Sequence, residues 1–116
     1  MQYALLIYET SADFACREQA GDDATYFGPW RAYYKAVVEA GIYAGVKPLH
    51  APKTGTTVRR RDGKPLEQDG PSASSKEQLD GFMLLELPSL EAALECAARC
   101  PAASYGAVEI RCVARS

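Results

Sequence analysis

Two runs with the same order of strand- and helix-forming sequence constrain the fold of this chain more than any other feature. The first run has an apolar strand at 3–9, a helical pattern, and a second strand at 42–49. The second run has a strand at 82–87, another helical pattern, and a strand at 107–113. A hairpin signal lies between the two runs. This order predicts an α+β fold, the ferredoxin-like split βαβ sandwich with an inserted β-hairpin.

Both expected helices carry signals for their ends. Pro29 suits the first turn of the first helix, and Gly41 suits its C-terminal end. Ser89 is a candidate N-cap for the second helix, which Pro101 stops. The positions expected to form the buried stripe of the second helix are Leu90, Leu94 and Ala97. Residues 11–28 show no clear period and are expected to form a loop, with room for a short helix.

The inserted hairpin is predicted from its turn. Asp62-Gly63 lies between the strand-like runs 56–61 and 64–68, and an Asp-Gly pair favours a tight hairpin turn. The three arginines at 59–61 alternate between the two faces of their strand, so they do not form one basic patch. With 116 residues in all, we expect a single domain spanning 1–116.

Alternation along the strands separates two sheet faces with different chemistry. The face expected beneath the helices is wholly apolar: Leu5, Ile7, Met83, Leu85, Leu87, Val108, Ile110 and Cys112. The opposite face is mixed: Leu6, Tyr8, Phe82, Leu84, Glu86, Ala107, Glu109 and Arg111. Two helices cover only one face, so the apolar part of the other predicts a homodimer that packs sheet against sheet. The polar part of that face would then line a ligand pocket in the enclosed space.

Charge and composition exclude several classes of partner. Thirteen Lys and Arg against fifteen Asp and Glu give a net charge of −2, which argues against nucleic acid as the main partner. The apolar run at 3–8 is too short to span a bilayer and has no basic stretch before it, so no membrane segment or signal peptide is expected. The four cysteines are therefore expected to be reduced thiols in the cytoplasm.

No cofactor or metal is predicted. The chain has no G-x-G-x-x-G fingerprint for a dinucleotide. Its single histidine, His50, follows the second strand and suits a surface position better than a metal site. Cys96 and Cys100 are four residues apart on one helical face; buried structural thiols are preferred over a metal or redox pair. Aromatic residues at helical spacing favour core packing, although they would also suit an aromatic pocket: Tyr26, Trp30, Tyr33 and Tyr34.

Several motifs occur in order along nearly the whole chain. They are Asp69-Gly70-Pro71, Lys76-Glu77-Gln78-Leu79, Gly81-Phe82, Cys100-Pro101-Ala102-Ala103 and the run 105–111. Together they resemble the YCII-related superfamily, and in particular its subgroup named for the DGPF motif. The resemblance implies a ferredoxin-like fold and a homodimer of the dimeric α+β barrel type.

The function that the resemblance implies is broad. Most members of the family have no assigned role. Some look like small enzymes, among them a dehydrochlorinase that acts on a chlorinated hydroxyquinol, and DGPF members often occur near extracytoplasmic-function sigma factors, which suggests regulation or stress. This chain departs from the pattern: Ser72 replaces the Phe of DGPF, and Ser74-Ser75 replaces an acidic-threonine pair. Trp30 stands at the position best aligned with a first-helix histidine, so a His-Asp acid–base mechanism does not carry over.

Two functional hypotheses follow. In the first, the chain is a small cofactor-independent enzyme that acts on a small organic acid or phenolic compound in the dimer cavity. Asp69 or Glu109 would move a proton. The predicted substrate-binding residues are Tyr8, Arg111, Lys76 and Ser72. In the second, the chain is a non-catalytic regulatory dimer that binds a ligand or a protein; Asp69 then shapes a turn, and Ser72 and Lys76 belong to a solvated loop.

Overall fold

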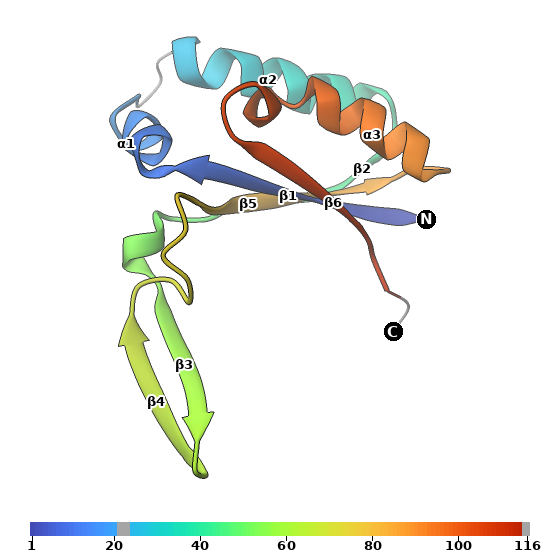
Figure 1. Ribbon diagram of the computed structural model, residues 1–116. Coiled ribbons are helices and arrows are strands. Elements are labelled where there is room, and N and C mark those ends of the chain that lie inside the picture. The colour runs from blue at the N-terminus through green and yellow to red at the C-terminus, as the bar shows by residue number, and fades with distance from the viewer. Residues whose placement is uncertain (21–23, 115–116) are drawn as a thin grey trace.

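A four-stranded antiparallel sheet forms the body of the protein, with strand order β2-β5-β1-β6. The computed structural model describes residues 1–20 and 24–114. The strands of this sheet are β1 (Gln2–Thr10), β2 (Tyr43–Pro48), β5 (Glu77–Glu86) and β6 (Ala107–Cys112). Helices α1 (Ser11–Ala20), α2 (Ala24–Glu39) and α3 (Leu90–Arg99) lie on one face of the sheet (Figure 1). This arrangement confirms the predicted α+β, ferredoxin-like fold.

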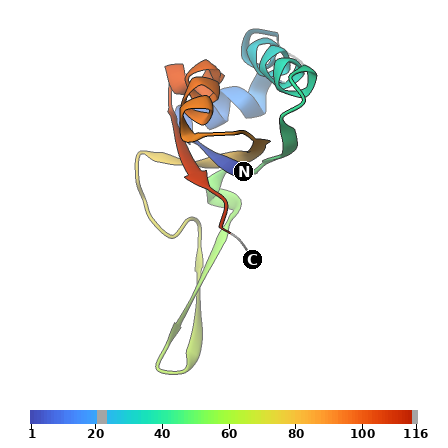
Figure 2. The same ribbon diagram turned by 90° about the vertical axis from the view of Figure 1, so that its right-hand side faces the viewer.

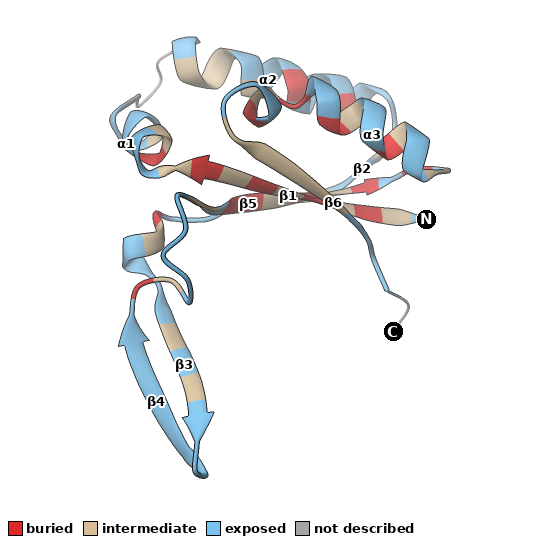
Figure 3. Ribbon diagram, in the orientation of Figure 1, coloured by how far each residue is buried: buried red, intermediate tan, exposed pale blue. Residues whose placement is uncertain are grey.

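The hydrophobic core lies between the sheet and the helices (Figure 3). The central strand β1 alternates strictly, and its buried apolar side chains meet those of β5 across the sheet. Leu5 and Leu85 are both fully buried. The predicted apolar face is confirmed except at Cys112, which is exposed because the end of β6 extends past the helices (Figure 1). The remaining face of the sheet, called the open face below, has no helix over it (Figure 2).

Helix α3 buries a different stripe from the one expected. The N-cap prediction is confirmed, because Ser89 Oγ accepts a hydrogen bond from the Ala92 amide at 3.2 Å. The buried residues, however, are Ala93 and Ala97. Leu90 and Leu94 are 54% and 52% exposed, so their predicted burial is wrong. Small alanine side chains allow the helix backbone to approach the sheet closely, and hydrophobic periodicity alone gave the two leucines too much weight.

The segment 11–28 is more helical than expected, since it contains the short helix α1 and also the start of α2; residues 21–23 lie outside the described part of the chain. Asp13 Oδ2 accepts hydrogen bonds from the Thr10 amide at 3.0 Å and the Thr10 hydroxyl at 2.8 Å. The Asp13 amide donates back to Thr10 Oγ1 at 3.3 Å, which makes a reciprocal cap for α1. Pro29 lies inside α2 rather than in its first turn. It removes one helical hydrogen bond, while the burial of Tyr33 and Val37 holds the helix on the core.

Strand β5 begins at Glu77 and not at residue 82, because β1 pairs with the added residues. Thr10 lies opposite Glu77 and Glu9 opposite Gln78, after a register shift between Ile7 and Tyr8. Such pairing depends on a distant segment, and the local sequence does not reveal it. Two short 3₁₀ helices, η1 (Pro52–Thr54) and η2 (Pro101–Ser104), complete the connections.

Strands β3 (Thr56–Arg61) and β4 (Lys64–Asp69) form the predicted hairpin, called the arm below. Asp62 and Gly63 have φ values of 52° and 74°. Positive φ at both central residues is what a type I′ turn requires, so the turn prediction is confirmed. The arm projects away from the body on the open-face side of the sheet (Figures 1 and 2).

A matched pair of substitutions tests the packing of α3. Leu85→Ala removes a fully buried side chain and should lower the free energy of unfolding by about 2–5 kcal/mol. Leu94→Ala removes the same atoms from a half-exposed position and should cost less than about 1 kcal/mol. Urea unfolding measures both. Equal losses of unfolding free energy would show that Leu94 is buried, and that α3 turns a different face toward the sheet.

Candidate functional site

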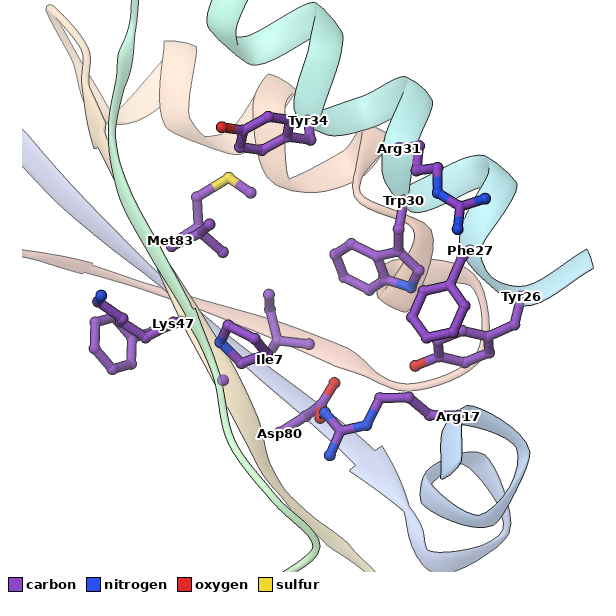
Figure 4. A pocket seen from close by; sticks show the side chains of 14 residues that line it. Ile7, Arg17, Tyr26, Phe27, Trp30, Arg31, Tyr34, Lys47, Asp80 and Met83 are labelled. Carbon is purple, nitrogen blue, oxygen red and sulfur yellow. The ribbon is translucent and has the colours of Figure 1, made fainter. Parts of the chain in front are cut away.

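A cavity of about 310 Å³ lies between α2 and strands β1, β2 and β5, on the helix side of the sheet (Figure 4). This volume is at the lower end of the range for small-molecule sites. One wall is aromatic, and α2 supplies all of it: Tyr26, Phe27, Trp30 and Tyr34. Ile7 and Met83 form apolar surface opposite this wall (Figure 4). We call this cavity the aromatic pocket. Of the four residues that would suit an aromatic pocket by their spacing, Tyr26, Trp30 and Tyr34 line this cavity. Tyr33 is buried in the core instead.

The floor of the aromatic pocket carries an ion pair. Asp80 from β5 is only 7% exposed, and its Oδ1 accepts a hydrogen bond from Arg17 Nη1 of α1 (Figure 4). The second nitrogen of that guanidinium, Nη2, donates to the Leu49 carbonyl. The Arg17 guanidinium also lies 5.0 Å from the centre of the Phe14 ring. These contacts orient a half-buried cation beside a buried carboxylate.

A second carboxylate, Glu9, lies fully buried at the end of β1. Tyr26 donates its hydroxyl hydrogen to Glu9 at 3.1 Å, and Tyr105 donates to Glu9 Oε1 at 2.8 Å. Trp30 Nε1 donates to the Tyr105 hydroxyl oxygen at 3.1 Å. In the aromatic wall, Tyr26 is thus bonded to Glu9 directly, and Trp30 is linked to it through Tyr105. We call Glu9 and Asp80 the carboxyl pair.

Burial and proximity change the acidity of these groups. Burial raises the pKa of Asp80 to about 7, and the neighbouring Glu9 adds to the increase while Arg17 opposes it. Burial also raises the pKa of Tyr26 and of Tyr105, so both phenols stay protonated hydrogen-bond donors. Asp80 is therefore a group that can hold or release a proton near neutral pH, which is the property needed for general acid–base chemistry.

Three of the residues predicted from the sequence meet in a second hollow, of about 640 Å³. Tyr8, Lys76 and Glu109 line it together with Tyr105. We call it the polar hollow. Arg111 Nε donates to Glu109 Oε2 at 2.6 Å, which lowers the pKa of the Glu109 carboxyl. The predicted grouping of Tyr8, Glu109 and Arg111 on one sheet face is consistent with this geometry.

The structure does not bring Asp69 and Ser72 to either site. Asp69 is the last residue of β4, is exposed, and pairs with Thr56 across the arm. Ser72 is exposed in the following loop, where its carbonyl accepts a hydrogen bond from Arg59 Nη2 at 3.0 Å. Neither residue lines the aromatic pocket or the polar hollow. Their proposed roles stay predictions without support from this arrangement.

The groups that the sequence reasoning missed are Glu9, Arg17 and Asp80. One signal was present: Glu9 continues the alternation of Leu5 and Ile7, and it places a charge on the apolar face. The other two carry no local signal. Arg17 and Asp80 are 63 residues apart in the sequence, and only the packing of α1 against β5 brings them together.

The described part of the chain has neither a cluster of metal ligands nor a helix suited to span a membrane. Residues 1–20 and 24–114 contain no cluster of three or more His, Cys, Asp or Glu side chains placed to hold a metal ion. Cys100 is buried, and burial raises the pKa of its thiol to about 11. Over the same described residues, the structure has no helix that is both long and apolar enough to cross a membrane.

Comparison with known proteins gives two matches over almost the whole chain. A family profile described as the YCII-related domain matches residues 1–115. An uncharacterized protein of Rhizobium meliloti (strain 1021) is 33% identical over 113 residues, which cover 96% of this chain and 90% of that protein. The likeness therefore includes the segments that form both the aromatic pocket and the polar hollow.

The raised pKa of Asp80 predicts a pH dependence of stability. The folded chain holds this proton more tightly than the unfolded chain, whose ordinary value is 3.8, so the stabilisation is present at acidic pH. It is lost as the pH rises through about 7. Relative to Asp80→Asn, wild-type protein should lose about 1–3 kcal/mol of unfolding free energy between pH 4 and pH 8. Urea unfolding across this range measures the difference.

The control for this experiment is Asp62→Asn at the exposed hairpin turn. Asparagine tolerates the positive φ of this position, so the substitution changes a carboxylate without disturbing the backbone. Its difference from wild type should stay flat from pH 5 to pH 8. A flat difference for Asp80→Asn as well would show that the folded protein does not raise the pKa of Asp80.

Proposed function

The chain belongs to the YCII-related family, and we propose that it is a small-molecule enzyme in which Asp80 transfers a proton within the aromatic pocket. The observation that carries the proposal is the buried Asp80 carboxyl at the floor of a ligand-sized cavity, beside the Arg17 guanidinium. A group that transfers a proton must be accessible to the ligand, and its pKa must lie near the working pH. Asp80 meets both conditions.

The walls of the pocket favour a planar anionic ligand. Four aromatic side chains offer flat apolar surface. Three basic side chains, Arg17, Arg31 and Lys47, are among the residues that line the pocket, and a guanidinium suits an anionic group on the ligand. The Arg31 guanidinium lies 5.7 Å from the centre of the Phe27 ring, over the aromatic wall. We therefore infer a small organic acid or phenolic compound as the substrate class.

The chemical step is a proton transfer that balances within the site. The Asp80 carboxylate accepts a proton from an acidic C–H bond of the ligand; the C–H bond breaks, an O–H bond forms, and the electron pair stays on the ligand as an enolate or phenolate. The Arg17 cation stabilises that negative charge. Return of the same proton to another position of the ligand restores Asp80 and completes an isomerisation.

A second candidate function is a ligand-binding regulatory dimer without turnover. The observation in its favour is that Asp80 is paired with Arg17 and Glu9 is bound by Tyr26 and Tyr105. Among the described residues, no buried side-chain nitrogen or oxygen lacks a hydrogen-bond partner. A fully satisfied buried network can hold the fold together without any reaction.

Pairing of two chains through the open face is part of the proposal. Leu6 lies opposite Phe82 on one side and Glu109 on the other, so the apolar and polar parts of this face form continuous rows. Leu6, Phe82 and Leu84 are only half-buried within one chain. A homodimer would cover these side chains and enclose the polar hollow.

Two finer assignments belong to the proposal as well. The retained Asp69-Gly70-Pro71 supports membership of the DGPF subgroup, although Ser72 departs from its motif. All four cysteines, at 16, 96, 100 and 112, are free thiols, which supports a reducing compartment such as the cytoplasm.

Ligand binding gives the first test. Benzoates and phenols that bind the folded protein should raise its melting temperature by mass action. Arg17→Gln should abolish the shift for a ligand that wild type binds, because the half-buried cation is lost. Arg61→Gln, the same change in the exposed arm, should leave the shift intact. If no acid or phenol raises the melting temperature of wild type, the inferred substrate class is wrong.

Proton transfer is tested separately from binding. A bound organic acid that carries an acidic C–H bond beside a carbonyl is incubated with the protein in heavy water. Nuclear magnetic resonance follows the replacement of that C–H proton by deuterium. Wild type should catalyse this exchange, and Asp80→Asn should bind the ligand while slowing exchange about a hundredfold or more. Binding without exchange by wild type would decide for the regulatory alternative.

The dimer is tested by light scattering at micromolar concentration. Wild type should be dimeric, and Leu84→Glu should be monomeric because it places a carboxylate in the apolar row of the open face. Leu94→Glu is the matched control, since Leu94 is already half-exposed on α3. It should stay dimeric. Monomeric wild type would refute pairing through the sheet.

A further inference from the structure

The arm is a two-stranded ribbon with little of the molecule packed against it. Val58 and Leu66 are 62% and 54% exposed, and every residue of β4 is exposed. Figure 3 shows β4 wholly in the exposed class and β3 in alternating exposed and intermediate segments. An isolated two-stranded hairpin is marginally stable in water. The arm therefore lacks the covering that a stable ribbon of this kind needs.

The two ends of the arm are nevertheless joined to each other at its base. The Gly70 amide donates to the Gly55 carbonyl at 2.8 Å, and Thr57 Oγ1 donates to the Gly70 carbonyl at 2.8 Å. These bonds join the two ends of the ribbon where it leaves the body. The arm extends on the open-face side of the sheet, so a molecule docked on that face lies beside it (Figures 1 and 2).

The charge of the arm tip is opposite to that of the remaining chain. Residues 59–64 contain four basic side chains and one acidic side chain. The rest of the chain has nine Lys and Arg against fourteen Asp and Glu. The tip is thus basic and the remainder acidic, which is the complementarity that two copies of one chain need to attract each other tip to body.

We propose that the arm is held against the body of a second copy of this chain, so that each protomer of the dimer grips its partner with a basic tip. The inference rests on the proposed pairing through the open face. It adds a second contact, made by a segment that a sheet-to-sheet dimer does not require. Reciprocal exchange of the same element is what two-fold symmetry produces.

Limited proteolysis with trypsin tests the contact directly, because the tip offers three cleavage sites for this protease, after Arg59, Arg60 and Arg61. The bond after Lys64 is resistant because Pro65 follows it. Cleavage within the arm, mapped by mass spectrometry, should slow about tenfold when the protein concentration rises from below to above the dimer dissociation constant. Cleavage in the arm at a rate independent of concentration would overturn the proposal. Protection by an added oligonucleotide but not by concentration would do so too.

A charge reversal provides the second test. Arg60 and Arg61 make only local hydrogen bonds, to the carbonyls of Gly63 and Arg60, so the double variant Arg60→Glu, Arg61→Glu should fold. Its dimer dissociation constant, measured by analytical ultracentrifugation, should rise about tenfold or more relative to wild type. The difference between the two dissociation constants should become smaller at high salt, because salt screens the charges. The single variant Lys35→Glu reverses an exposed charge on α2 and should leave dimerisation unchanged.

The outcomes separate the arm from the sheet-face dimer. If wild type is dimeric and Leu84→Glu is monomeric, while the arm variant keeps the wild-type dissociation constant, the sheet pairing stands and the arm contact is refuted. If wild type is monomeric at all accessible concentrations, both are refuted. Weakening by the arm variant together with protection from trypsin supports the contact.

Discussion

The burial of two carboxyl groups on an otherwise apolar sheet face is the constraint on which the site depends. A buried charge must be paired or protonated, since leaving it bare costs several kcal/mol. Glu9 meets this requirement through Tyr26 and Tyr105, and Asp80 through Arg17. These partners come from α1, α2 and the segment before β6, so the same hydrogen bonds that satisfy the carboxyl pair also fix the helices over the sheet.

A second constraint is that helices cover only one side of a single sheet. The covered side takes the core and the aromatic pocket, and the open face keeps a row of half-buried apolar side chains beside the pair Glu109 and Arg111. The division places two hollows at different surfaces of the molecule. The one with the buried carboxyl is suited to chemistry, whereas the more polar one faces the surface proposed for pairing.

Local patterns were sufficient for the fold, because each carried its own physical signal. Alternation identified the core face, Asp62-Gly63 identified the hairpin, and Ser89 identified the start of α3. The errors arose where contacts between distant segments determine the structure. Strand β5 is longer than predicted because β1 pairs with its first residues. Helix α3 buries alanines and not leucines, because small side chains allow the helix to approach the sheet closely. The site was the harder problem. Its acid and its cation are distant in sequence, whereas Tyr8 and Glu109, found by alternation, share a hollow as expected.

Tyr105 gives this architecture a property that neither hollow has alone. Its ring lines the polar hollow, while its hydroxyl donates to the buried Glu9 and accepts from Trp30 in the aromatic wall. Tyr105 thus lines the polar hollow and is linked by one hydrogen bond to Trp30, which lines the aromatic pocket. A ligand in the polar hollow that rotates the Tyr105 ring would break its hydrogen bond to Glu9. If this changes the affinity of the aromatic pocket for its ligand, thermodynamic linkage requires that ligand to change the affinity of the polar hollow by the same free energy.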